Sequence, residues 1–106
     1  MRPELYRDSM TERQLQDAIR KQARLYKWLC YHCYDSRRSP EGFPDLVLVK
    51  DYQLFFWELK TAKGRVTPEQ TAWIEALAKV EHHSATLVRP EDLDKCLALL
   101  AGTSDN

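Results

Sequence analysis

The chain has 106 residues, which is enough for one domain with a single modest hydrophobic core. Hydrophobic residues make up 43% and charged residues 30% of the sequence, an ordinary balance for a soluble globular protein. Sixteen basic and sixteen acidic side chains give a formal net charge of zero, so the overall charge does not favour a polyanionic partner, although its distribution still can.

The sequence contains no candidate membrane span, since none of its apolar runs, Leu54–Trp57 among them, is long enough to cross a bilayer. It also lacks the charged start and apolar stretch of a secretory signal. We therefore expect a cytoplasmic protein with no membrane partner. Three cysteines are an odd number, and a disulfide framework is not expected in a reducing cytosol.

The N-terminal third predicts an arm followed by a helix. Residues 1–10 have no clear periodicity and are expected to form a flexible arm. Residues 11–14 fit a capping box, after which residues 12–29 should form an amphipathic helix. Its inner face is apolar, with Leu15, Ala18, Ile19, Tyr26 and Leu29 at helical spacing. Its outer face is strongly basic, with Arg13, Arg20, Lys21, Arg24 and Lys27.

The middle of the chain predicts three strands. Residues 30–35 suit a short strand, and a polar loop follows it. Two segments rich in branched and aromatic side chains, 45–50 and 54–60, predict an antiparallel hairpin. The three residues 51–53 would connect its strands.

The last third predicts a helix, a strand and a helix. After a turn at 63–65, a capping threonine and a proline at 67–68 start the second helix, whose apolar side would be Trp73, Ile74, Leu77 and Val80. Residues 84–88 predict a strand, Pro90 opens a last helix through Leu100, and residues 101–106 form a frayed tail. This order predicts an α/β fold with a central mixed sheet flanked by helices, in one domain spanning residues 11–100.

Charged residues stand at the open end of the apolar hairpin. Because strand side chains alternate, Glu58 and Lys60 project from the same side, and the hairpin can bring Asp45 opposite them. Two neighbouring carboxylates repel each other unless a positive charge lies between them. Mg²⁺ takes such oxygen ligands, acidifies a bound water and neutralises a phosphodiester, while a lysine can orient the water. The pattern therefore favours metal-assisted phosphodiester hydrolysis.

A purely structural interpretation of these residues stays open. Asp45 follows Pro44 and could simply start a strand, and Glu58 with Lys60 could be a solvated pair. The charges interrupt an otherwise apolar run, however, and this favours a functional site.

The same residues resemble a known family. The segment Gly-Phe-Pro-Asp at 42–45, followed after twelve residues by Glu-Leu-Lys at 58–60, resembles the motif of PD-(D/E)XK nucleases. With Thr-Pro-x-Gln-x-x-Trp at 67–73, the pattern resembles more narrowly the VRR-NUC (virus-type replication-repair nuclease) domain over about residues 11–100. The resemblance implies a restriction-endonuclease-like αβββαβ core, a Mg²⁺- or Mn²⁺-dependent endodeoxyribonuclease, and a phage or bacterial origin.

The resemblance also implies a role for each residue that matches the motif. Asp45 and Glu58 would bind the metal together with the backbone carbonyl of Leu59. Lys60 would be the catalytic lysine.

Two further residues have a structural alternative. Glu12 would face the metal directly or through water, although an acid in the first helical turn also suits the helix dipole. Gln70 would lie near the site, but it could also be only the capping partner of Thr67.

Basic residues near the motif are the candidates for holding DNA. Lys63 and Arg65 follow Lys60 closely, and Arg37 and Arg38 lie in the polar loop before the motif. The charges of the first helix are interpreted as a solvated face. Nothing suggests base readout, so recognition through phosphates and DNA shape is expected.

The resemblance further implies a homodimer that cuts branched DNA in the manner of Holliday-junction resolvases. A two-fold dimer would supply the two symmetric cuts that a four-way junction needs. Less specific flap or duplex cleavage and a catalytically silent nucleic-acid-binding module stay open. A zinc module built on Cys30, Cys33 and His82-His83 is a weaker alternative, because no second CxxC exists, so no structural zinc is expected.

Overall fold

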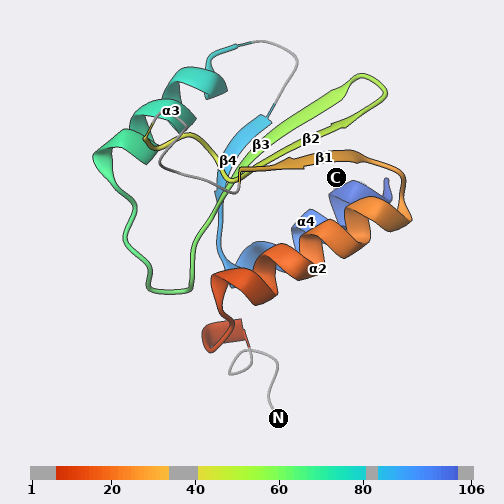
Figure 1. Cartoon of the computed structure of the whole chain (residues 1–106), viewed down its shortest axis with the longest axis horizontal. Coiled ribbons are helices and arrows are strands. Elements are labelled where there is room, and N and C mark those ends of the chain that lie inside the picture. The colour runs from red at the N-terminus through yellow and green to blue at the C-terminus, as the bar shows by residue number, and fades with distance from the viewer. Residues whose placement is uncertain (1–6, 34–40, 81–83, 103–106) are drawn as a thin grey trace.

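The computed structural model describes residues 7–33, 41–80 and 84–102. A four-stranded mixed sheet carries α2 and α4 on one face and α3 on the other (Figure 1). The elements follow in the order α2 (Glu12–Leu25), β1 (Leu29–His32), β2 (Leu46–Lys50), β3 (Gln53–Leu59), α3 (Pro68–Ala78), β4 (Ser84–Val88), the 3₁₀ turn η1 (Pro90–Asp92) and α4 (Leu93–Ala101). The predicted fold class and core order are confirmed.

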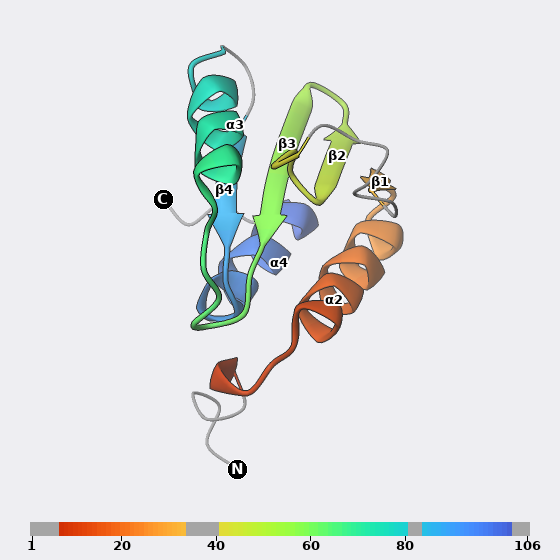
Figure 2. The ribbon, with the colours of Figure 1, turned by 60° about the vertical axis from the view of Figure 1, so that its left-hand side comes forward.

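The sheet has the strand order β1-β2-β3-β4, with β1 at one edge. β1, β2 and β3 pair antiparallel, whereas β3 and β4 pair parallel across the α3 crossover. The carboxyl ends of β3 and β4 therefore lie side by side (Figure 2), and the residues that follow these two strands are neighbours.

The β2–β3 turn is one residue shorter than predicted. Lys50 pairs with Gln53, so only Asp51 and Tyr52 connect the strands. Asp51 has a φ of 54°, the left-handed conformation that tight two-residue hairpin turns require.

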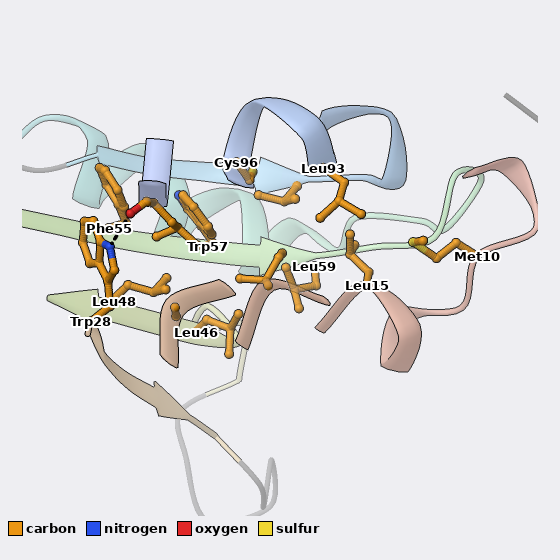
Figure 3. Packing of buried hydrophobic residues seen from close by; sticks show 14 residues of the cluster. Met10, Leu15, Trp28, Leu46, Leu48, Phe55, Trp57, Leu59, Leu93 and Cys96 are labelled. Atoms are coloured by element: carbon orange, nitrogen blue, oxygen red, sulfur yellow. Dashed lines mark hydrogen bonds between the residues drawn. The ribbon is translucent and has the colours of Figure 1, made fainter. Parts of the chain in front are cut away.

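The hydrophobic core lies between the sheet and the helices α2 and α4 (Figure 3). Leu15 and Ile19 of α2 are fully buried, as the helical spacing predicts. The rings of Trp28, Phe55 and Trp57 stack in sequence with centroid separations of 5.2 Å. The core holds α2 against the hairpin, and Glu12 at the start of α2 lines the same hollow as Asp45 and Leu59 at the hairpin's open end.

The first helix ends earlier than predicted. It stops at Leu25 because Lys27 adopts a φ of 66°, and the Trp28 amide donates to the Ala23 carbonyl at 2.8 Å. The turn carries Trp28 into the core, where its indole N–H donates to the Leu100 carbonyl at 2.9 Å (Figure 3). Tyr26 and Leu29, which the sequence assigned to the inner face, are exposed instead.

The described part of the predicted N-terminal arm is packed against the domain. Met10 is buried in the core, and the Arg7 guanidinium lies 2.8 Å from the Asp94 carboxylate. Residues 1–6 and 103–106 lie outside the described residues.

Helix α3 begins as predicted but packs more loosely than predicted. Thr67 caps it and Pro68 is its first residue. Trp73 is only half-buried, and Val80, assigned to the apolar side, is 59% exposed and lies beyond the helix end. The reason is that α3 covers only the β3–β4 part of its face of the sheet.

Candidate active site

The hairpin brings Asp45 and Glu58 together at its open end. Leu46 pairs with Trp57, so Asp45, one residue earlier, lies beside Glu58, one residue later. The Leu59 amide donates a hydrogen bond of 2.9 Å to Oδ2 of Asp45. The structure thus assembles the predicted pair, and the backbone of β3 itself positions the first carboxylate.

Glu58 is a charged side chain in the interior, with only 2% of its surface exposed. Its Oε2 accepts a 2.6 Å hydrogen bond from Nε2 of Gln70 and lies 3.9 Å from Nζ of Lys60. Its Oε1 is buried and has no hydrogen-bond donor within the described residues. An ionised buried carboxylate with one unsatisfied oxygen is costly, so this oxygen needs a proton or a cation.

The protonation of Glu58 reflects these surroundings. Burial, and after it the neighbouring Asp45 carboxylate, which a protonated Glu58 can hydrogen-bond, raise the pKa of Glu58 to about 8. The Lys60 ammonium acts in the opposite direction, while the charge of Glu12 adds a smaller upward effect. In the absence of a cation, Glu58 therefore holds a proton at neutral pH.

Gln70 caps helix α3 and also contacts Glu58, so the two positions that the sequence left open for it are compatible. Its backbone amide and side-chain oxygen complete the capping box with Thr67, at 3.1 and 2.9 Å. The side-chain amide of the same residue donates to Glu58. A glutamine can do this because its oxygen and its NH₂ group are separate acceptor and donor.

The segment Gly42–Asp45 packs against the first turns of α3. A Cβ on Gly42 would come within 2.5 Å of the Glu69 backbone carbon, and Gly42 has a φ of 91°, which glycine adopts without strain. Phe43 meets the Trp73 ring edge-to-face at 5.1 Å, and the Trp73 indole N–H donates to the Glu41 carbonyl at 3.1 Å. These contacts fix α3, and with it Gln70, relative to Asp45.

Glu12 lies at the first position of α2, on the opposite side of the site from α3. It is exposed, and its charge reaches Glu58 only as a minor contribution. In residues 7–33, 41–80 and 84–102, no three Asp, Glu, His or Cys side chains are close enough together to form a metal-binding group. The geometry therefore does not place Glu12 beside the two carboxylates as a third direct ligand.

A hollow of about 530 Å³ opens between α2 and the ends of the strands. Polar side chains of α2 form one wall, from Glu12 to Arg20. His32, Asp45 and Leu59 form the opposite wall. Three of the four residues predicted to hold the metal, Glu12, Asp45 and Leu59, thus line a space large enough for part of a substrate.

The predicted DNA-binding residues are only partly described. Lys63 and Arg65 are exposed in the connection between β3 and α3, close to Lys60 in the chain. Arg37 and Arg38 lie outside the described residues.

The sequence did not point to Arg89, which organises this connection. Its guanidinium donates to the carbonyls of Thr61, Ala62 and Gly64 at 2.7, 3.2 and 3.0 Å. Arg89 directly follows β4, and β4 lies parallel to β3, so the two strand ends meet. A basic residue directly after the last strand is the one sequence signal that could have suggested it.

Cys30 and Cys33, the pair considered as zinc ligands, are both half-buried. Cys30 packs against the hydrophobic cluster, and burial raises the pKa of its thiol. Cys33 is half-buried at the end of the described segment, and the two histidines of the zinc alternative lie outside the described residues. The zinc alternative gains no support from this geometry.

Comparison with known proteins identifies the class. The model of the VRR-NUC domain family matches residues 5–87, most of the chain, so this protein belongs to the VRR-NUC domain family. A VRR-NUC domain implies a nuclease of the PD-(D/E)XK type, and nucleases of this superfamily generally use divalent metals. No curated protein matches the chain. No helix within the described ranges is long and apolar enough to cross a bilayer.

One solved structure has the same fold. It belongs to a protein described as a VRR_NUC domain protein, with a TM-score of 0.66 and 21% sequence identity. The similarity covers 89% of this chain and 88% of the other. At this level of identity it supports the fold and leaves the individual site residues to be argued from their own geometry.

Proposed function

We propose that this protein is a Mg²⁺- or Mn²⁺-dependent endodeoxyribonuclease whose active site is the Asp45–Glu58 pair with Lys60. The observation that carries the proposal is the buried, unsatisfied Oε1 of Glu58 beside a second carboxylate. A hard divalent cation satisfies such an oxygen and separates two like charges. A structural role alone gives no reason to place a buried acid against a second, half-buried acid that repels it.

The donor set suits a magnesium-type ion, which takes one or two carboxylates and keeps several waters. Asp45, Glu58 and the Leu59 carbonyl would hold it, with Glu12 acting through water rather than directly. The ion, when bound, would supply an acidified water and neutralise the phosphodiester.

The remaining groups act on the phosphate or position the ligands. Gln70 holds Oε2 of Glu58, which leaves Oε1 for the cation. The Lys60 ammonium, half-buried and adjacent to Glu58, would stabilise negative charge on the reacting phosphate. Lys63 and Arg65, and Arg37 and Arg38 in the preceding loop, would contact the DNA backbone without reading bases.

The substrate that we propose is branched DNA, most simply a four-way junction, cut by a homodimer. The proposal follows the resemblance to stand-alone members of the family, which also suggests a phage or bacterial protein of the cytoplasm. Leu29 and Tyr31, on the edge strand β1, are 74% and 63% exposed and provide apolar surface for a second copy. Light scattering of the native protein and of Leu29→Glu would test this, since a dimer through β1 should dissociate in the variant.

The activity is tested on a labelled four-way junction, a flap, a plain duplex and single-stranded DNA, each with Mg²⁺, Mn²⁺ or EDTA. We expect metal-dependent paired nicks in the junction, and losses of at least about 100-fold in Asp45→Asn and in Lys60→Ala. Asp51→Asn, which makes the same change in the exposed hairpin turn, and Lys79→Ala, at the far end of α3, are the matched controls.

The outcomes separate the alternatives. Equal cutting of every duplex substrate would retain the nuclease and exclude the junction preference. Absence of cutting with either metal, by a protein that is folded and binds DNA, would exclude the enzyme and leave a binding module.

A further inference from the structure

The hollow beside the carboxylates has two chemically different ends. Along its α2 wall, Glu12, Gln16 and Arg20 follow one another at intervals of four residues, so they form a single row. At 1.5 Å per residue the row is about 12 Å long. It begins at Glu12, whose charge has a minor effect on Glu58, and ends at Arg20.

The row ends at a basic residue, Arg20. Arg20 and His32 both line the hollow, one from α2 and the other from β1, where His32 pairs with Leu46, the residue next to Asp45. Burial lowers the pKa of His32 and the positive charge of Arg20 lowers it further, whereas the Asp45 charge raises it. The Arg20 charge also partly offsets the burial that raises the pKa of Cys30, two residues earlier in β1. The guanidinium therefore lies within electrostatic range of both side chains.

Arg20 also differs from the other basic residues of α2. It is half-buried, whereas Arg13, Lys21 and Arg24 are exposed. A solvated face, the interpretation made from the sequence, describes those three but not Arg20. A partly desolvated guanidinium binds phosphate oxygens in a fixed fork and more strongly than a fully hydrated charge does.

We propose that Arg20, with Gln16 and His32, forms a phosphate-binding subsite that holds a DNA backbone phosphate neighbouring the scissile one. The hollow has room for more than one phosphate group, since its volume of about 530 Å³ is that of a site for a small organic ligand. In this arrangement Asp45 is left for the cation, and Arg20 at the end of the row takes the next phosphate. Arg13 and Asp17, the two further charged residues of the wall, are both exposed.

This inference rests on the proposed function, because only a nucleic-acid substrate has a second phosphate at this position. It adds three residues that the nuclease motif does not contain. It also assigns DNA binding to α2, whereas the sequence favoured Lys63 and Arg65.

The test compares Arg20→Gln with Arg24→Gln, which removes the same charge one turn further along the helix and outside this hollow. Binding of a fluorescent four-way junction is measured by anisotropy at several salt concentrations, with EDTA present and in an Asp45→Asn background. We expect Arg20→Gln to weaken binding about ten-fold and to reduce the salt slope by about one, because one phosphate contact is lost. Arg24→Gln should change binding less than about two-fold.

Two further variants allow the subsite to be tested even if Arg20→Gln does not fold. Arg20→Lys keeps the charge but loses the fork, and we expect an intermediate loss of affinity. His32→Gln keeps a polar side chain, and we expect it to weaken binding in the same direction. Thermal unfolding identifies any variant that is not folded, and the comparison then uses the remaining ones.

The results separate this inference from the proposed function. If the native protein cuts DNA but Arg20→Gln and Arg24→Gln bind equally, the subsite is wrong and the nuclease stands. If binding depends on Arg20 but no metal supports cutting, the subsite stands and the enzyme does not. If the native protein binds none of the DNA structures, both are wrong.

Discussion

Helices α2 and α3 lie on opposite faces of the sheet, yet both begin with the pattern Thr-x-x-Gln. In α2, Thr11 and Gln14 form a complete capping box, and in α3 Thr67 and Gln70 form the same box with nearly the same distances. Gln14 is exposed and does nothing further in the described contacts, whereas Gln70 also donates to Glu58. The same local motif therefore has a purely structural role in one place and contacts the candidate site in the other.

The difference arises from what packs on each helix start. Gly42 lies against the backbone of Glu69 and Gln70, which brings the first turn of α3 to the open end of the hairpin. The described contacts contain no equivalent close approach at the start of α2, where Glu12 affects Glu58 only through its charge. Residues within one helical turn thus determine whether a capping box forms. Residues far apart in the sequence determine whether its glutamine also reaches Glu58.

The largest expected effect concerns the protonation of Glu58, the residue on which both helix starts act. Its folded-state pKa of about 8 lies above the usual value of 4.5, so between these values the folded protein holds one proton more than the unfolded chain. The free energy of unfolding without metal should then fall as pH rises across this window, by at most about 1.4 kcal/mol per pH unit. Urea unfolding in EDTA between pH 4.5 and 8.5 measures it.

Glu58→Gln is the control, because it should lose this dependence while keeping the opposite, smaller contribution of His32, whose pKa is lowered mainly by burial. Identical pH profiles for the native protein and this variant would contradict the raised pKa. Mg²⁺ should stabilise the native protein more at pH 8 than at pH 6, since it competes with the proton.

The second prediction removes the close approach that distinguishes the two helix starts. Gly42→Ala should lower the free energy of unfolding by about 3 kcal/mol or more, because the new Cβ meets backbone atoms and the positive φ is strained. Gly102→Ala has a similar φ of 86° and meets nothing within 4 Å, so it should lose only about 1–2 kcal/mol. Equal losses in urea unfolding would show that the contact with α3 is unimportant.

The third prediction separates the two roles of Gln70. In Gln70→Glu the side-chain oxygen still caps the helix, but the donor to Glu58 is lost and a third negative charge is added. We expect nuclease activity to fall about 10- to 100-fold in a variant that still folds. The matched change Gln14→Glu at α2 should keep activity within about two-fold. Comparable activity in the two variants would contradict a role for Gln70 in the site.

The smallest expected effect concerns the threonine cap, which the starts of α2 and α3 share. Thr11→Ala and Thr67→Ala should each lower the free energy of unfolding by about 1 kcal/mol, since each removes one capping hydrogen bond. Neither should alter activity strongly, because the Thr67 amide still holds the side-chain oxygen of Gln70. A selective loss of activity in Thr67→Ala would mean that the cap itself positions the site.

Much of the fold was predictable because its signals are local. The capping boxes, the alternating apolar strands of the hairpin and the strand at 84–88 agree with the observed elements. The predicted element boundaries were wrong where tertiary contacts determine the end of a helix or strand. The first helix ends at Leu25 because Trp28 turns into the core, and the hairpin turn is shortened by the left-handed conformation of Asp51.

Part of the candidate site was predictable for the same reason. Strand alternation and hairpin pairing place Asp45 beside Glu58, and residues 42–45 and 58–60, which resemble the nuclease motif, lie within the range that the family model matches. The direct approach of Glu12 is not seen in the geometry, and Arg89 and Arg20 were not expected to matter. Their positions depend on which helix or strand end packs beside β3, and no pattern within one element contains that information.

The sequence by itself determined the class of fold, the nuclease motif and the two helix caps, since each depends on residues a few positions apart or on one hairpin. Only the tertiary structure decided that Gln70 reaches Glu58, that Arg89 holds the turn after β3, and that Arg20 and His32 face the same hollow. The physical reason is that hydrogen bonds within one turn form wherever their residues occur. A contact across the sheet forms only when the core has fixed the elements in place.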